Sequence, residues 1–182
     1  MWGYIILGVV VVIVFWLIAT YNSFVSLKNR VDNSFAQMDV QLKKRFDLVP
    51  NLVETVKGYA GHEKEIFIKI AEARNSITDA KDIDERKEGE QKLNIGLRNL
   101  FAVAEAYPAL KADENFRQLQ AQLTDLESKI AFSRQFYNDV VMKLNTKVQT
   151  FPSNIVAGMF KFTEKKYFEI DNGEREAVKV KF

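Results

Sequence analysis

The chain has 182 residues, a formal net charge of +2 and no cysteine. Its acidic and basic residues are interspersed, so the charge pattern of a nucleic-acid-binding protein is missing and no nucleic-acid partner is expected. Three prolines and eight glycines are too few turn formers for an all-β protein, and the periodicity of the apolar residues predicts an all-α fold.

The first predicted element is an apolar run from Trp2 to Thr20 that contains no charged side chain. A bilayer core about 30 Å thick requires roughly 20 apolar residues in a helix, so we predict a single transmembrane helix over residues 1–21. The run lacks the basic start and the short apolar core of a cleaved signal peptide. Lys28 and Arg30 follow the run and no cation precedes it, which predicts an N-terminus outside and the remainder in the cytoplasm.

An antiparallel bundle of three to four helices is predicted over residues 22–150. Apolar residues recur about every 3.7 positions from Leu27 to Ala60, and no glycine or proline separates this stripe from the membrane segment. We therefore expect one continuous helix from Trp2 to about Tyr59, on the order of 85 Å long. Pro50 is expected to kink this helix without ending it.

The middle of the bundle is predicted to be a helical hairpin. Helical phase continues over residues 62–77, and the next helix is expected to stop before Pro108. Between them, the stretch from Asp79 to Lys92 carries charges of both signs. We interpret it as a solvated, exposed hairpin tip that leads into the second helix.

Asp113 is a good N-cap for the last long helix, whose apolar seam runs from Phe116 to Val148. A polar cluster accompanies the end of this seam, and part of it is expected to face the bundle interior. We predict a structural hydrogen-bonded network that fixes the helix register. A ligand or signal-sensing site that binds an anion is the alternative. The residues of the cluster are Arg134, Tyr137, Asn138, Asp139 and Asn145.

The final segment, residues 151–182, is rich in aromatic and apolar residues and is too apolar to remain in water. We expect it to dock on its own bundle, on a neighbouring subunit or on the membrane surface. The last residues, from Val178 to Phe182, alternate as a strand would. The candidate docking contacts are Phe151, Phe160, Phe162, Tyr167 and Phe168.

Residues suited to catalysis are scarce. His62 is the single histidine, and without a second histidine or a cysteine it cannot build a zinc site. Phosphate-binding glycine loops and nucleophile elbows are absent from the sequence. We therefore predict no catalytic, cofactor-binding or metal site and no enzymatic activity. A second polar constellation flanks Pro50, and we expect Asn51 or a nearby side chain to satisfy carbonyls freed by the kink; its members are Arg45, Asp47, Asn51 and Glu54.

Several of these segments resemble the LemA family of bacterial membrane proteins. The resemblance begins in the run from Arg45 to Tyr59, followed by His62-Glu63. It continues in Glu114-Asn115-Phe116, in Arg134-x-x-Tyr137-Asn138-Asp139, in Phe151 to Asn154 and in Lys165 to Phe168. It implies a single span in the bacterial inner membrane, a cytoplasmic antiparallel bundle and no established enzymatic activity. It also implies an association with membrane proteases or with the organisation of membrane compartments.

The function that these observations favour is a non-enzymatic, membrane-anchored helical scaffold. The lipid bilayer is its first expected partner, and the apolar C-terminal segment predicts a homo-oligomer. An adaptor or regulator of a membrane protease, or of another membrane protein, is the alternative from the class of regulatory proteins. A sensor that uses the cluster from Arg134 to Asp139 is the third hypothesis.

Overall fold

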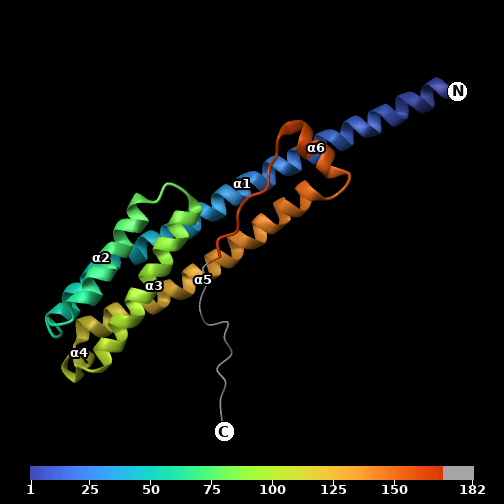
Figure 1. The fold of residues 1–182 in the computed structure, drawn as a ribbon. Helices are drawn as coiled ribbons and strands as arrows, with labels where there is room; N and C mark the ends of the chain where they lie inside the picture. The colour runs from blue at the N-terminus through green and yellow to red at the C-terminus, as the bar shows by residue number, and fades with distance from the viewer. Residues whose placement is uncertain (170–182) are drawn as a thin grey trace, which may run out of the picture. The chain divides into compact units, whose positions relative to one another are not determined.

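The structure is a computed structural model, and it describes residues 1–169. These residues form helices and no strand, which confirms the predicted all-α class. The helices are α1 (Trp2–Lys57), α2 (Lys64–Asp79), α3 (Ile83–Glu105), α4 (Pro108–Ala112), α5 (Glu114–Gln149) and α6 (Ser153–Phe160) (Figure 1). The alternating segment from Val178 to Phe182 lies outside the described residues.

The predicted long N-terminal helix is present as α1, a single helix of 56 residues. Pro50 lies inside it without ending it, and the helix ends at Lys57, directly before Gly58. Among the described helices, α1 alone is long and apolar enough to cross a membrane, and none of its most apolar window is buried. Ordinary globular helices hide such a face, whereas this part of α1 has no partner among residues 1–169.

The hairpin of α2 and α3 refines one expectation. The tip is shorter than the charged stretch from Asp79 to Lys92, because the connection comprises only residues 80–82 and α3 already begins at Ile83. The side chain of Asp82 caps α3 by accepting hydrogen bonds from the backbone N–H groups of Asp84 (2.8 Å) and Glu85 (2.9 Å). A capping Asp followed by acidic residues in the first turn favours an early helix start, and this outweighs the low apolar content.

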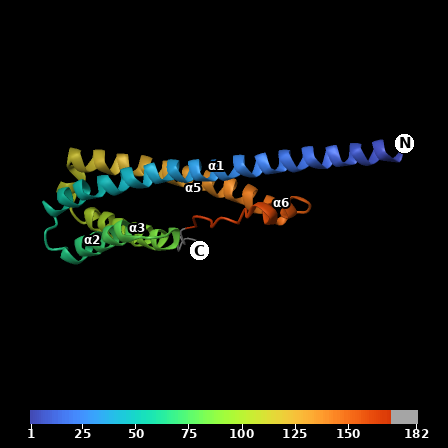
Figure 2. The ribbon, with the colours of Figure 1, turned by 90° about the horizontal axis from the view of Figure 1, so that it is seen from above.

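Helices α2 and α3 lie side by side and run antiparallel (Figures 1 and 2). Two glycines of α3 allow this close approach. A Cβ atom at Gly89 would lie 2.8 Å from Ile77 Cγ1, 3.0 Å from the Ile77 backbone nitrogen and 3.2 Å from the Ser76 carbonyl carbon. A Cβ atom at Gly96 would lie 2.8 Å from Ile70 Cγ1. Larger side chains at these positions would push the two helices apart.

The chain forms two compact units. Among the described residues, the first comprises Met1–Val40 and Ile130–Tyr167, and the second comprises Gln41–Lys129 together with Phe168 and Glu169. In the first unit, α1 and α5 run antiparallel, because Ser23 contacts Lys147 whereas the later Phe35 packs its ring on the earlier Tyr137, with centroids 5.7 Å apart.

The second unit has a continuous apolar core to which α1, α2, α3, α4 and α5 all contribute. The short α4 contributes a fully buried leucine, and Asp113 caps α5 by accepting a hydrogen bond of 2.8 Å from the Phe116 N–H, as predicted. The central core residues are Val49, Leu52, Val56, Ile70, Leu93, Leu97, Leu100, Leu110, Phe116 and Leu123.

Candidate functional site

A charged cluster lies inside the second unit and is centred on Arg45 of α1, which is 1% exposed. Its Nη2 donates to Oε2 of Glu90 on α3. Its Nη1 donates to Oδ1 of Asn94 at 2.7 Å and to Oε1 of Glu127 on α5 at 2.6 Å. Glu90 and Asn94 are one helical turn apart on the same face of α3. One guanidinium group therefore ties three helices together at a single level of the bundle.

The cluster combines a fully buried ion pair, Arg45–Glu90, with a partly solvent-exposed one, Arg45–Glu127. Glu90 is 1% exposed, whereas the side chain of Glu127 is 44% exposed, so the second carboxylate connects the group to water. Burial raises the pKa of the Glu90 carboxyl above its ordinary value, and the Arg45 guanidinium opposes this by lowering it. The planar fork of arginine suits such a site, since it donates to several oxygen acceptors in fixed directions.

This geometry corrects one expectation from the sequence. Glu90 belongs to the stretch that we expected to be solvated, yet it is fully buried. Arg45, which the sequence placed among the polar residues around Pro50, directs its guanidinium to α3 and α5. Chemically, the cluster holds two carboxylates and an amide oxygen in hydrogen bonds to one guanidinium group, an arrangement that is suited to setting helix register.

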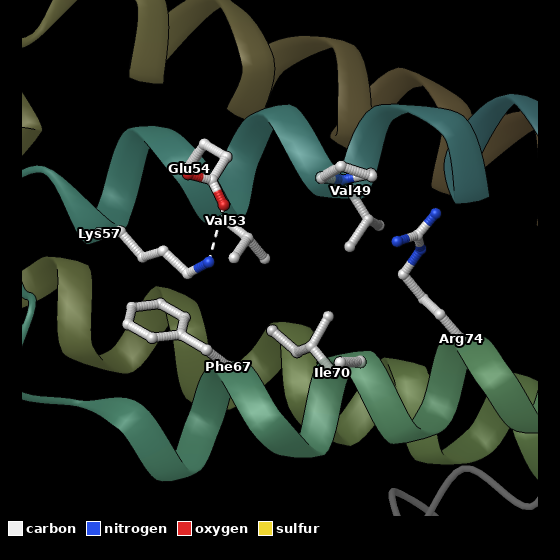
Figure 3. Close-up of a pocket in the computed structure, with 9 residues that line it drawn as sticks. Val49, Val53, Glu54, Lys57, Phe67, Ile70 and Arg74 are labelled. Carbon is white, nitrogen blue, oxygen red and sulfur yellow. Dashed lines mark hydrogen bonds and ion pairs between the residues drawn. The ribbon is translucent and has the colours of Figure 1, made fainter.

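A shallow pocket of about 150 Å³ lies beside Pro50, between α1 and α2 (Figure 3). Phe67 and Ile70 line it from α2. Lys57 reaches over the Phe67 ring at 5.6 Å from the centroid and pairs with Glu54 at 2.7 Å (Figure 3). Small-molecule sites commonly measure about 300–1,000 Å³, so this pocket is too small for an organic substrate.

Two residues of the predicted C-terminal polar cluster hold the chain that follows α6. The Tyr137 hydroxyl donates to the Lys166 carbonyl at 2.9 Å. Asn145 donates through Nδ2 to the Lys165 carbonyl at 2.9 Å, and its Oδ1 accepts from the Lys165 N–H at 2.8 Å. The amide of Asn145 thus pairs with both backbone groups of Lys165, much as a residue on a neighbouring strand would.

The other members of that cluster lie elsewhere. Arg134 and Asn138 are partly buried on α5, and Asp139 is exposed. Within residues 1–169, the side chains of Arg134 and Asp139 make no hydrogen bond or ion pair. The structure therefore joins Tyr137 and Asn145 through the backbone of residues 165 and 166. A network that includes all five residues stays a prediction.

The candidate docking residues of the C-terminal segment divide into three groups. Phe160 and Phe162 contact α1: the Phe160 ring lies 4.7 Å from that of Tyr21, and the Phe162 ring stacks at 4.8 Å on that of Phe24. Phe151 is 79% exposed and Tyr167 is 37% exposed, whereas Phe168, in the second unit, is fully buried.

The described residues contain no group of three or more side chains that could bind a metal ion. His62 lies in the connection after α1 and is exposed. Fold and site together define a class: a helical protein in which an unpartnered apolar helix continues into a bundle that is held in register by buried charges.

Comparison with known proteins assigns the family. The LemA family model matches residues 34–182, and the chain belongs to this family. A relative named magnetosome protein MamQ 1, from Paramagnetospirillum magneticum, is 25% identical over 186 residues, which is 88% of this chain and 68% of the relative. Protein LemA of Metamycoplasma hominis is 24% identical over 163 residues, with shares of 84% and 74%. Magnetosome protein MamQ of Magnetospirillum gryphiswaldense is 22% identical over 178 residues, with shares of 84% and 65%.

Proposed function

We propose that this protein is a non-enzymatic scaffold that is anchored in a membrane by α1 and assembles with copies of itself. The observation that carries the proposal is the exposed apolar face of α1, which continues without a break into the helices of the bundle. Ile6, Phe15 and Ile18 are each more than half exposed on the N-terminal part of the helix. A surface of this kind is stable only when lipid or protein covers it.

The charge distribution supports an orientation with the N-terminus outside and the bundle in the cytoplasm. Lys28 and Arg30 are exposed on α1 shortly after the apolar run, and no cation precedes the run. The positive-inside rule places such residues on the cytoplasmic side of a bacterial inner membrane. Because the chain has no cysteine, the single variant Gln135→Cys on α5 can be labelled with a membrane-impermeant maleimide. Labelling only after the cells are lysed supports this orientation, and labelling in intact spheroplasts contradicts it.

Two relatives carry the name magnetosome protein, which fits a role within a larger cellular assembly better than a role as a free enzyme. The charged cluster around Arg45 also supports a structural role, because its acceptors are paired rather than open to a substrate. Mass measurement of the detergent-extracted full chain tests self-assembly. We expect an oligomer that loses subunits when residues 151–182 are deleted. A strict monomer before and after the deletion contradicts the assembly.

A further inference from the structure

Helix α6 carries an apolar face with no partner among the described residues. Its buried side is formed by Val156 and Ala157. On the other side, Ile155 is 51% exposed and Met159 is 63% exposed, and these two residues are one turn apart. Phe151, just before the helix, is 79% exposed. Residues 151–160 contain no charged side chain, and apart from Ser153 and Asn154 the segment is apolar, so its exposed face is largely apolar.

The position of α6 along α1 is set by aromatic contacts within the first unit. The Phe160 ring lies 4.7 Å from the Tyr21 ring, and the Phe162 ring lies 5.8 Å from it. Tyr21 directly follows Thr20, the last residue of the apolar run. A tyrosine at the end of a membrane span lies at the level of the lipid headgroups. Phe160 is therefore at the same depth as the end of the span.

We propose that the exposed face of α6 lies in the headgroup region of the membrane and forms a second contact with the lipid surface. The proposal rests on the membrane crossing by α1 that is proposed above. It adds that Phe151, Ile155 and Met159 are immersed in the interface, where an amphipathic helix buries its apolar face about 5–10 Å deep. The lipid-facing surface of α1 is then continuous with that of α6.

The chain after α6 has the charge that an anionic membrane surface attracts. Lys161 caps α6 in the left-handed conformation (φ 58°) and is exposed. Lys165 and Lys166 follow, and two acidic residues, Glu164 and Glu169, lie in the same stretch, so residues 161–169 carry a net charge of +1. Juxtamembrane lysines are attracted to the negative surface of anionic lipid. The apolar face and the adjacent cations thus favour one occupant, a membrane that contains acidic phospholipid.

Lipid contact at α6 restricts how α1 rotates and tilts in the membrane. The rotation and tilt of a single membrane span are set by its interfacial anchors and by packing against other segments. A second contact beside Tyr21 restrains that rotation, because α6 lies on one side of α1. Asn145 and Tyr137 hold the chain that leaves α6, so the second contact is firmly connected to α5.

The test uses the full chain in vesicles made of equal parts phosphatidylcholine and phosphatidylglycerol. Because the chain has no cysteine, single variants can be labelled with a fluorophore that bromine atoms on the lipid acyl chains quench. Met159→Cys reports on α6, and Val11→Cys reports on the span. Phe132→Cys is the matched control, because Phe132 is a 73% exposed apolar residue of the same unit. It precedes the end of α5 by about 26 Å of helix.

We expect a large loss of fluorescence at residue 11, a loss at residue 159 that is close to it, and little loss at residue 132. Quenching at residue 11 with equal, weak quenching at residues 159 and 132 overturns this inference and leaves the membrane anchor intact. Absence of quenching at residue 11 overturns the anchor and this inference together. A disulfide between two chains at Met159→Cys, formed without lipid quenching, assigns the face to a second copy and also overturns the inference.

Discussion

The guanidinium of Arg45 and the carboxylate of Glu90 meet in the second unit with each side chain 1% exposed, although they are 45 residues apart in the sequence. Charges that are removed from water in this way cost free energy unless both are paired. The pairing extends to Glu127, because the same guanidinium donates to that half-exposed carboxylate at 2.6 Å. This relationship makes the register of α1 against α3 and α5 testable.

Arg45→Met should destabilise the second unit by about 3–5 kcal/mol, because it leaves the Glu90 carboxylate buried without its partner. Adding Glu90→Leu should recover most of that loss, since two buried apolar side chains need no charged or hydrogen-bonding partner. Urea unfolding of the full chain in detergent, followed by circular dichroism, measures both effects. Lys129→Met removes only the exposed pair with Asp125 and should leave the midpoint nearly unchanged. Equal midpoints for Arg45→Met and Lys129→Met would contradict the structural role of the cluster.

The burial of Glu90 also predicts a pH dependence. The pKa of Glu90 is raised in the folded protein, so its stabilising contribution is complete below the unfolded pKa of about 4.3. That contribution is lost as the pH rises through the folded pKa. Glu90→Gln does not titrate. The free energy of unfolding of this variant minus that of the parent should therefore increase from pH 4 towards pH 7. A difference that is constant over this range would show that Arg45 fully offsets the effect of burial.

The two glycines of α3 should respond differently to alanine. Alanine gains about 1 kcal/mol of helix propensity over glycine at either position. At Gly89 the new Cβ atom meets backbone atoms of Ile77 and Ser76, which cannot rotate away, so Gly89→Ala should be destabilising by about 1–2 kcal/mol overall. At Gly96 the close neighbour is the side-chain atom Ile70 Cγ1, which can move, so Gly96→Ala should be near neutral. Thermal unfolding of the pair measures the contrast, and a reversed order would show that α2 and α3 pack differently.

Tyr137 and Asn145 together clamp the backbone of residues 165 and 166, and hydrogen exchange can separate their contributions. The Lys165 N–H donates to Asn145, whereas Tyr137 binds the next carbonyl, that of Lys166. Asn145→Ala should therefore abolish protection of the Lys165 amide. Tyr137→Phe should retain much of that protection and cost about 1 kcal/mol of stability, the net value of one hydrogen bond. If Asn145→Ala leaves the Lys165 amide protected, the clamp is not the one that the structure shows.

Local chemistry determined much of this fold. The apolar repeat predicted α1 as one helix to within two residues of its end at Lys57. Asp113 predicted the start of α5, because a capping carboxylate acts on N–H groups only a few residues away. The motifs that resemble the LemA family were sufficient to assign the family that the comparison confirms. Each of these signals is contained within a short stretch of chain, so the sequence by itself carries it.

The pairing of the charges around Arg45 depends on the tertiary structure. Arg45 lies at helical spacing with Leu42 and Val49, and Glu90 with Leu93, so both charges occupy core positions of apolar stripes. That spacing is the signal that could have identified them. A stripe nevertheless does not reveal whether a charge on it is solvated or paired, because the answer depends on residues 45 and 82 positions away. The partners of Tyr137 and Asn145, and the place of α6 beside Tyr21, depend on long-range packing in the same way.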